Sequence, residues 1–315
     1  MNKKIAFLFP GQGSQAVGMG RDFYDNFPTA RRVFDEADAA LGFPISKLCF
    51  DGPEEQLKLT ENTQPAILTV SFAAAVLLHE RGIDAHSVAG HSLGEYAAHA
   101  VAGTFSFTDA VRTVRNRGRY MQDAVPAGQG AMAAILGLPA GQITAACAEA
   151  AAATGSVVAP ANFNAPEQTV ISGSVAGVEA AGARCKERGA KRVVLLPVSA
   201  PFHCALMQPA QDRLAADLKQ IHFHAPQFPV VCNVDAAQVT SGEAARDTLI
   251  RQVTGAVRWV ECIQWLIAQG VTHFVEVGPG KVLCGLMRQI DRNQICLNVE
   301  DSASLNKTLE ALALV

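Results

Sequence analysis

The chain has 315 residues, of which 49% are hydrophobic and 17% charged, so it is long enough to bury a large core. A formal net charge of -3 excludes a general nucleic-acid binder, which needs positive charge clustered over a whole face. No apolar run approaches membrane-spanning length, and the eight cysteines include no C-x-x-C pair. This cysteine pattern fits a reducing cytoplasm better than a disulfide framework or a zinc site.

The first predicted element is a buried parallel strand over residues 4–9, an apolar run that ends at Pro10. The run is too short for the apolar core of a signal peptide. The loop that follows contains Gly11 and Gly13, but the next glycine is Gly18, so the spacing of a dinucleotide fingerprint fails. The loop is either a glycine loop at a strand end that contacts a ligand or a plain tight turn. Its residues alone do not distinguish these two interpretations.

Two helices are predicted before residue 87. The first spans about residues 21–41. The second spans about residues 65–81, with Pro65 in its first turn and Gly82 as its stop.

The segment Gly90-x-Ser92-x-Gly94 has the spacing of a nucleophile elbow. A short apolar run leads into it and an alanine-rich segment leads out of it, as expected for a strand before the turn and a helix after it. The flanking glycines let the chain make a strained turn, which would present the Ser92 hydroxyl at the mouth of the helix. The context therefore favours an activated serine over an incidental turn.

A helix over about residues 109–125, capped by Thr108, carries one arginine in an unexpected place. Arg117 falls on the apolar face of this helix, opposite to its other arginines. Because an unpaired buried guanidinium is costly, Arg117 should have an anionic partner, either a structural Asp or Glu or the carboxylate of a bound substrate. Internal ion pairs are commoner than ligand clamps, so the spacing alone favours the structural partner.

Residues 130–199 show the order strand, helix, strand, strand, helix, strand. The predicted strands and helices are 131–136, 140–153, 157–162, 169–172, 175–188 and 192–198. This order is typical of a ferredoxin-like subdomain inserted into a larger domain.

The chain returns to the larger domain at Ser199-Ala200-Pro201-Phe202-His203, where Pro201 stiffens the approach to His203. A histidine in a defined loop at a domain junction is well placed to act as a general base, although a lone histidine is usually a packing or surface residue. The remaining chain alternates strands and helices, which predicts a mostly parallel sheet covered on both faces. The segment 278–281 lacks P-loop spacing and is predicted to be a turn.

Taken together, these features are similar to those of malonyl-CoA:acyl carrier protein transacylases, and the resemblance runs essentially from end to end. The motifs that carry it are Phe9-Pro10-Gly11-Gln12-Gly13-Ser14-Gln15, Gly90-His91-Ser92-Leu93-Gly94-Glu95-Tyr96, Arg115-x-Arg117-Gly118, Asn162, Val170-Ile171-Ser172-Gly173, Pro201-x-His203 and Glu276-x-Gly278-Pro279-Gly280.

The resemblance implies a role for each matching residue. Ser92 is the implied nucleophile, His203 its base, and the main-chain N–H groups of Gln12 and Leu93 the oxyanion hole. Arg117 is implied to bind the malonyl carboxylate, which reverses the preference drawn from spacing. Further implied roles are substrate contact by Asn162, crowding of an α-methyl group by Phe202, and orientation of His203 by the backbone carbonyl of Gln252.

The expected fold is α/β, with an α/β-hydrolase-like catalytic domain over residues 1–127 and 200–315 and a ferredoxin-like subdomain over residues 128–199. The expected activity is malonyl transfer from malonyl-CoA to the phosphopantetheine thiol of an acyl carrier protein, in fatty acid synthesis in the cytoplasm. The resemblance implies no metal, no separate cofactor, no nucleic acid and no membrane. The basic residues from Arg184 to Arg192, together with Lys281 and Arg288, are the expected docking surface for the acidic carrier.

Two other functions remain open from the residues. A serine hydrolase shares the elbow, but such enzymes order the triad as Ser, then Asp or Glu, then a late His. Here the best histidine is in mid-chain and no acidic residue between Ser92 and His203 sits at an obvious strand end, which favours a Ser-His pair. The third function is an inactive acyltransferase-like protein that only binds a carrier, and the joint presence of Ser92, His203 and Arg117 argues against it.

Overall fold

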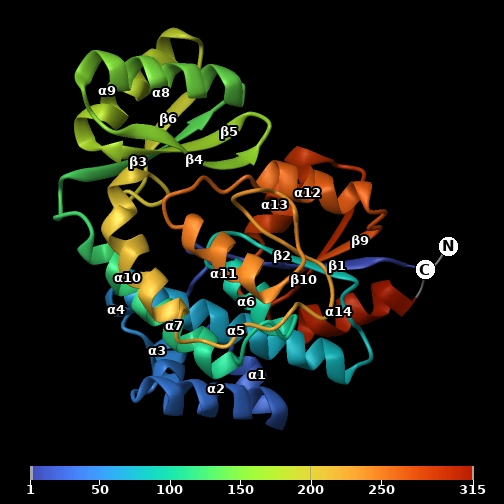
Figure 1. Ribbon diagram of the computed structural model, residues 1–315. Helices are drawn as coiled ribbons and strands as arrows, with labels where there is room; N and C mark the ends of the chain where they lie inside the picture. The colour runs from blue at the N-terminus through green and yellow to red at the C-terminus, as the bar shows by residue number, and fades with distance from the viewer. Residues whose placement is uncertain (1–2, 199, 314–315) are drawn as a thin grey trace.

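The computed structural model describes residues 3–198 and 200–313. Within these residues, a six-stranded sheet forms the centre of the larger part of the molecule (Figure 1). In spatial order its strands are β10 (Ile295–Val299), β9 (His273–Val277), β1 (Ile5–Phe9), β2 (Ser87–Gly90), β7 (Val230–Val231) and β8 (Gln238–Val239). All neighbours are parallel except β7 and β8, so the prediction of a mostly parallel sheet is confirmed.

The first strand shows why this sheet is covered on both faces. Every residue of β1 is buried, as its continuous apolar sequence predicts for a central parallel strand. Ile5, Phe7 and Phe9 belong to one hydrophobic cluster, whereas Ala6 and Leu8 belong to another. This alternation follows from the two-residue period of a strand, and it places a separate core on each side of the sheet.

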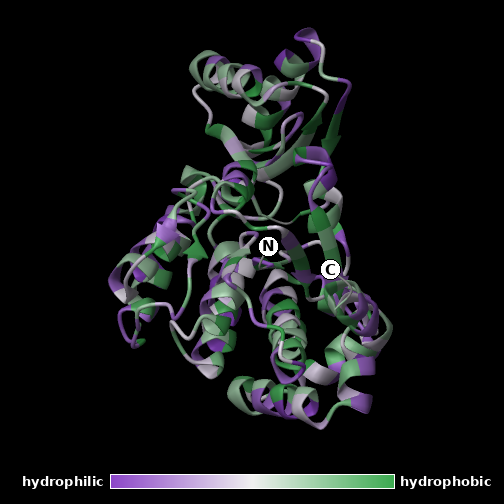
Figure 2. Cartoon of the chain, turned by 90° about the vertical axis from the view of Figure 1, so that its right-hand side faces the viewer, coloured by the Kyte–Doolittle hydropathy of each residue, from purple (hydrophilic) through white to green (hydrophobic). Residues whose placement is uncertain are grey.

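Helices cover both faces of the sheet (Figure 1), and hydrophilic and hydrophobic residues follow one another along them (Figure 2). Before the small sheet they are α1 (Arg21–Asn26), α2 (Pro28–Leu41), α3 (Ile45–Asp51), α4 (Glu54–Leu57), α5 (Thr60–Glu80), α6 (Gly94–Val101) and α7 (Phe107–Asp123). After it they are the short 3-10 helix η1 (Ala205–Met207), α10 (Gln208–Leu218), α11 (Gly242–Arg251), α12 (Trp259–Ala268), α13 (Val282–Ile290) and α14 (Ser302–Ala313). In the described ranges, none of these helices is long and apolar enough to cross a membrane.

Several helix boundaries differ from those predicted. The segment 21–41 is two helices, because Phe27 is extended and Pro28 opens a new helix at a position where its missing N–H costs nothing. Helix α5 begins at Thr60, so the placement of Pro65 in the first turn is wrong. The cap of α7 is Ser106, whose hydroxyl accepts from the N–H of Asp109, and not Thr108.

A second sheet contains four antiparallel strands and lies above the larger part in Figure 1. In spatial order the strands are β4 (Val158–Ala165), β5 (Gln168–Ser174), β3 (Gly130–Leu136) and β6 (Arg192–Leu195). Helices α8 (Ala140–Thr154) and α9 (Val175–Glu187) pack against one face through a third hydrophobic cluster. Ser199, the predicted end of this segment, lies outside the described residues.

Main-chain hydrogen bonds fasten the small sheet to the larger part. The N–H of Val257 donates to Ala161 O at 2.8 Å, and the N–H of Phe163 donates to Val257 O at 2.9 Å. Asn162, between them in β4, is buried. These bonds hold β4 beside the carboxyl ends of β1 and β2, where open α/β sheets place ligands.

Candidate active site

The turn from β2 into α6 holds Ser92 in a strained conformation. Its φ angle is 51°, in the left-handed region that residues other than glycine rarely adopt. A side chain on Gly90 would meet the backbone carbon of Gly94 at 1.9 Å, and one on Gly94 would meet Phe9 O at 2.1 Å. Only glycine fits at these two positions, so the turn is built for close backbone approach as the elbow pattern predicts.

His203 lies directly against Ser92. Its Nε2 is 2.7 Å from Ser92 Oγ, and its Nδ1 lies 2.9 Å from Gln252 O and 3.1 Å from Gly255 O. Because a carbonyl can only accept, Nδ1 carries the proton and Nε2 is left to accept the serine proton. Burial, aided by the charge of Arg117, lowers the pKa of His203 to about 3, so the ring is neutral near pH 7.

Arg117 reaches the same point from α7. Its side chain is 2% exposed, and its Nη2 donates to Ser92 Oγ at 3.1 Å and to Gln252 Oε1 at 3.0 Å. Its Nη1 donates to Gln64 Oε1 at 2.7 Å. The structural acid that the spacing favoured is not found: in the described part of the chain, no Asp or Glu oxygen lies within ion-pair distance of this guanidinium. Arg117 is therefore a buried cation held by neutral groups, with its Nε left without a hydrogen bond.

A cavity of about 120 Å³ adjoins these three side chains. Its lining includes the remaining residues implied by the resemblance, which are Gln12, Leu93, Asn162 and Phe202. Within the described residues, the main-chain N–H groups of Gln12 and Leu93 have no hydrogen-bond acceptor. Two free N–H donors, one in the loop after β1 and one at the N-terminus of α6, are suited to an oxyanion.

A buried polar network beneath the elbow was not predicted. Asn233 accepts from the N–H of Ser92 at 2.7 Å and donates to Gly90 O at 2.7 Å, so it holds both sides of the turn. Glu95, with 0% of its surface exposed, accepts from the N–H of Asn233 at 2.9 Å and from Gln252 Nε2 at 2.7 Å. A glutamate in an alanine-rich helix was a visible signal for a buried polar group, but its partners lie more than 130 residues further along the chain.

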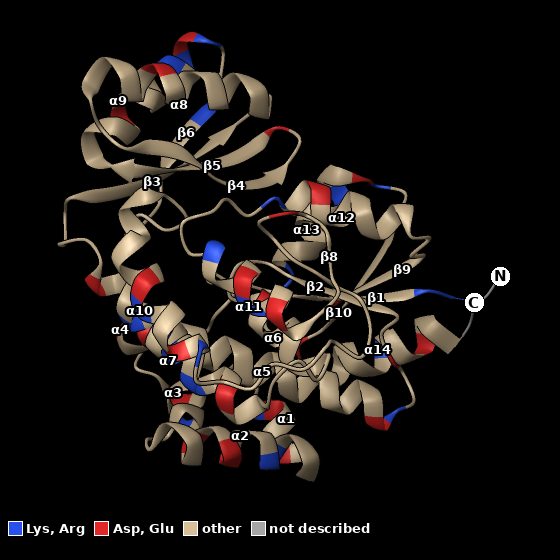
Figure 3. Cartoon of the chain, in the orientation of Figure 1, with Lys and Arg blue, Asp and Glu red and all other residues tan. Residues whose placement is uncertain are grey.

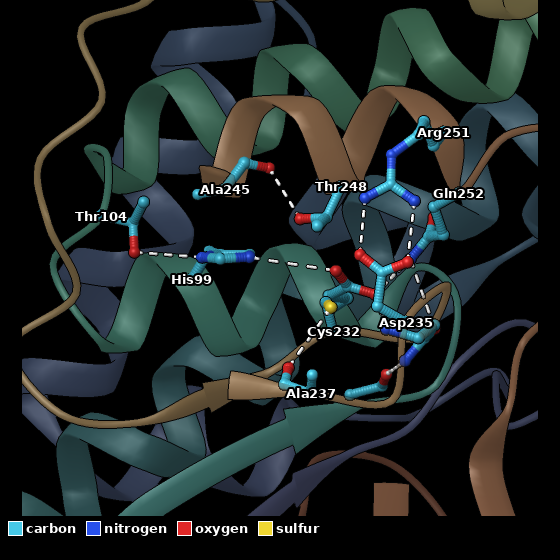
Figure 4. A network of polar contacts seen from close by, with 12 residues as sticks. His99, Thr104, Cys232, Asp235, Ala237, Ala245, Thr248, Arg251 and Gln252 are labelled. Carbon is cyan, nitrogen blue, oxygen red and sulfur yellow. Dashed lines mark hydrogen bonds and ion pairs between the residues drawn. The ribbon is translucent and has the colours of Figure 1, made fainter. Parts of the chain in front are cut away.

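An ion pair in the loop after β7 fixes the main chain directly before Gln252. Arg251 donates two hydrogen bonds to the two carboxylate oxygens of Asp235, at 2.8 Å and 2.6 Å (Figure 4). Such bidentate pairs are geometrically specific. The pair joins the loop after β7 to the end of α11, directly before Gln252.

The basic segment from Arg184 to Arg192 is partly neutralised by its neighbours. Arg184 and Arg188 both pair with Glu149 of α8, and Lys191 pairs with Glu167. Figure 3 shows blue and red residues close together beside α8 and α9. Lys281 likewise pairs with Glu300. In the described ranges, Lys186, Arg192 and Arg288 have no ion pair.

The fold and the site together define a class of protein. A mostly parallel α/β sheet carries a serine on a strained strand-to-helix turn, a neutral histidine within hydrogen-bond distance of it, and unpaired N–H donors beside it. This arrangement is that of enzymes that transfer or hydrolyse acyl groups through a serine.

Comparisons with known proteins narrow the class to one family. Residues 6–305 match the family model described as "Acyl transferase domain". The malonyl CoA-acyl carrier protein transacylase of Escherichia coli (strain K12) is 52% identical over 288 residues, which is 91% of this chain and 93% of that protein. The chain belongs to the malonyl CoA-acyl carrier protein transacylase family.

Solved structures agree with this assignment. An acyl carrier protein S-malonyltransferase from Vibrio cholerae is 48% identical, covers 97% of this chain and 100% of its own, and has a TM-score of 0.95. A malonyl-transacylase in complex with its type II PKS acyl-carrier protein (PlMCAT:AntF) is 47% identical, covers 98% of this chain and 100% of that chain, and has a TM-score of 0.95.

Proposed function

We propose that the protein transfers the malonyl group of malonyl-CoA to the phosphopantetheine thiol of an acyl carrier protein, and so supplies fatty acid synthesis. One observation carries the proposal: Ser92 Oγ lies within hydrogen-bond distance of both His203 Nε2 and Arg117 Nη2. A nucleophile, its base and a buried cation without a carboxylate partner thus meet in one cavity. A malonyl thioester supplies the two groups that this cavity lacks, a carbonyl to attack and a carboxylate to pair.

In the first half-reaction, Ser92 Oγ attacks the thioester carbon while His203 Nε2 takes the hydroxyl proton. The carbonyl oxygen becomes an oxyanion that the N–H groups of Gln12 and Leu93 stabilise, each by about 3 kcal/mol in comparable sites. The intermediate collapses, the C–S bond breaks, and His203 returns the proton to the departing CoA thiolate. The product is a malonyl ester of Ser92.

In the second half-reaction, His203 deprotonates the pantetheine thiol of the carrier, and the thiolate attacks the ester carbon. The C–O bond to Ser92 breaks, and Ser92 recovers its proton from His203. The carbonyls of Gln252 and Gly255 keep His203 in one tautomer through both halves. These steps use side chains and main-chain groups of the protein, and we propose that they need no metal or separate cofactor.

Arg117 gives the proposed selectivity. Its guanidinium can form two parallel hydrogen bonds with the free carboxylate of a malonyl group, and an acetyl group offers no such partner. We propose that Asn162 and Phe202 bound the space around this carboxylate, because both line the cavity.

A hydrolase with the same elbow is the alternative that the site argues against. Hydrolases of this kind orient the histidine with a carboxylate, whereas in the described residues the acceptors at His203 Nδ1 are two main-chain carbonyls.

We propose that the carrier docks against Lys186, Arg192 and Arg288, the members of the predicted basic surface without ion pairs in the described ranges. The complex reported for PlMCAT:AntF supports a carrier partner for such a chain. Reversal of these charges should raise the carrier KM and leave acylation by malonyl-CoA unchanged. An unchanged carrier KM would exclude this surface.

We also propose the division into a catalytic domain, residues 1–127 and 200–315, and an inserted subdomain, residues 128–199. The strand order β4-β5-β3-β6, with α8 and α9 on one face, supports a ferredoxin-like subdomain. We place the enzyme in the cytoplasm, which is supported by its eight free cysteine thiols.

The proposed function is tested by intact mass measurement after the protein is mixed with malonyl-CoA alone. A malonyl-sized adduct is expected on the wild type and not on Ser92→Ala, and a pantetheinylated carrier should discharge it. Steady release of CoA without an adduct would identify a hydrolase instead. No reaction at all would identify a binding protein.

A further inference from the structure

Gln252 contacts both groups that act on Ser92. Its side-chain Oε1 accepts from Arg117 Nη2 at 3.0 Å, and its main-chain carbonyl lies 2.9 Å from His203 Nδ1. A side-chain amide has one accepting end and one donating end. The Arg117 guanidinium can only donate, so Gln252 can bond to it only when the amide oxygen faces Arg117. The groups that accept from the amide NH₂ favour this orientation.

Three acceptors meet the donating end: Ser92 O at 2.9 Å, Asn233 Oδ1 at 3.3 Å and, at the shortest distance, the carboxylate of Glu95. Glu95 Oε2 accepts from Gln252 Nε2 at 2.7 Å and from the main-chain N–H of Asn233 at 2.9 Å. The N–H of Asn233 can only donate, so the Glu95 oxygen beside it has to be an acceptor. That oxygen therefore also faces the NH₂ group of Gln252, and the amide oxygen is turned toward Arg117.

The burial of this chain of contacts makes the orientation unique. Glu95 and Gln252 are each 0% exposed and Arg117 is 2% exposed, so water does not compete for these bonds. Arg117 Nη2 also reaches Ser92 Oγ at 3.1 Å, and Gln252 Nε2 donates to Ser92 O at 2.9 Å. The carboxylate of Glu95, the amide of Gln252 and the guanidinium of Arg117 thus form a continuous line that ends at the nucleophile.

We propose that Glu95 is a positioning residue for substrate recognition: through the amide of Gln252 it holds Arg117 in the orientation that receives the malonyl carboxylate. The inference rests on the proposed function. It assigns to Glu95 no contact with substrate and no proton transfer.

The test compares Ser92 acylation by malonyl-CoA and by acetyl-CoA, each followed by intact mass under single-turnover conditions with excess enzyme. The variants are Glu95→Met, which keeps the volume and removes the acceptor, and Glu95→Gln, whose amide oxygen can accept the same two bonds. We expect Glu95→Met to lower the malonyl-to-acetyl rate ratio by about tenfold or more, because only malonyl uses Arg117. We expect Glu95→Gln to keep the ratio within about threefold of the wild type. A merely structural defect would slow both substrates in proportion.

Gln252→Leu tests the residue between Glu95 and Arg117, and it replaces Glu95→Met if that variant does not fold. It removes the amide and keeps the main-chain carbonyl that holds His203. We expect the same loss of the malonyl-to-acetyl rate ratio.

Glu276→Met is the matched control. Glu276 is also 0% exposed and also accepts two main-chain N–H bonds, from Leu283 at 3.0 Å and Cys284 at 2.8 Å, but it has no contact with Gln252. We expect lower stability and an unchanged ratio.

The outcomes separate the two proposals. A wild type that forms no malonyl adduct would overturn the proposed function. A wild type that is malonylated, with an unchanged ratio in both Gln252→Leu and any folded Glu95→Met, would overturn the positioning role alone. An equal loss of ratio in Glu276→Met would also overturn it, since the effect would then follow from any buried carboxylate.

Discussion

Ser92 Oγ lies 2.7 Å from His203 Nε2, and both residues adopt positive φ angles, 51° for Ser92 and 59° for His203. Conformations of this kind cost on the order of 1–3 kcal/mol each and persist only where the surrounding structure fixes them. Here Asn233 fixes the serine turn, and the carbonyls of Gln252 and Gly255 fix the histidine. The surrounding fold therefore fixes the contact between the two side chains, as the proposed mechanism requires.

The pH dependence of acylation should reflect the buried position of His203. Because burial lowers its pKa to about 3, the ring stays neutral and able to accept a proton well below pH 6.5. We expect the rate of Ser92 malonylation, measured by quenched-flow intact mass, to stay level from pH 7 down to about pH 5. His203→Ala should be slower by about a hundredfold or more and should rise with pH, as hydroxide replaces the base. An acid limb with an apparent pKa between 6 and 7 in the wild type would show that His203 titrates normally.

Arg117→Ala should change selectivity more than it changes the chemistry at Ser92. Loss of the guanidinium removes the proposed partner of the malonyl carboxylate, and Ser92 and His203 keep their own contact. We expect malonyl-CoA to lose about 2–4 kcal/mol of transition-state binding, while acetyl-CoA is retained or improved. Rates on both substrates would be measured by CoA release in the presence of carrier. Unchanged selectivity would remove Arg117 from the site.

The sequence predicted those parts of the site that depend on local backbone geometry. The elbow follows from Gly90 and Gly94, whose lack of a side chain the turn requires, and the parallel sheet follows from the alternation of apolar runs and helices. The position of His203 after a stiff proline was likewise visible. Each strand, each helix, the elbow and the proline is encoded within one short segment of the chain.

What the sequence did not show depends on contacts between distant segments. Helix α5 begins five residues before Pro65, and its first turns bury polar side chains, among them Gln64, which accepts from Arg117. The spacing around Arg117 suggested an acid partner, yet its partners are amides and a hydroxyl from three other segments. A periodicity can show that a group is buried, but it carries no information on which distant side chain meets it.

Two glycine-to-alanine substitutions should have opposite effects on stability. A side chain on Gly90 would overlap the backbone of Gly94, which cannot move without opening the elbow. We expect Gly90→Ala to destabilise the fold by more than about 3 kcal/mol and to abolish acylation. Gly285 lies inside α13 with nothing within 4 Å of the added carbon, so Gly285→Ala should stabilise by about 0.5–1 kcal/mol. Urea unfolding measures both, and a Gly90→Ala protein of normal midpoint would contradict the strained turn.

His99 should make stability depend on pH. It is fully buried on α6, with Nδ1 3.1 Å from Thr104 Oγ1 (Figure 4), and burial lowers its pKa from 6.5 to about 3. Between these two pKa values the unfolded chain binds a proton at His99 that the folded chain does not bind. The contribution of neutral, buried His99 to the free energy of unfolding is therefore present above pH 6.5 and is lost as the pH falls. Between pH 7 and pH 5 we expect the wild type to lose about 2 kcal/mol more free energy of unfolding than His99→Asn.

Urea unfolding of both proteins at each pH gives this difference directly. Glu95 and Glu276, whose pKa values burial raises to about 7, act in the opposite sense. Glu276 does so in both proteins alike, whereas Glu95 Oε1 lies 4.0 Å from His99 Nε2, so the difference between the two proteins includes the coupling of this pair. Parallel curves for the wild type and His99→Asn would show that the unfolded and folded chains protonate His99 alike.

Phe202 should restrict the substituent next to the malonyl carboxylate. Its side chain is 8% exposed, lines the cavity and directly precedes His203. A methylmalonyl group adds one methyl at the carbon between the thioester and the carboxylate, and a filled cavity of about 120 Å³ leaves little room for it. We expect methylmalonyl-CoA to acylate Ser92 about tenfold more slowly than malonyl-CoA, and Phe202→Ala to recover most of that difference. Phe202→Leu should fall between the two, because it removes part of the ring volume. Measurement of both substrates on each variant makes malonyl-CoA the internal reference, and comparable wild-type rates on the two substrates would show that Phe202 does not restrict this substituent.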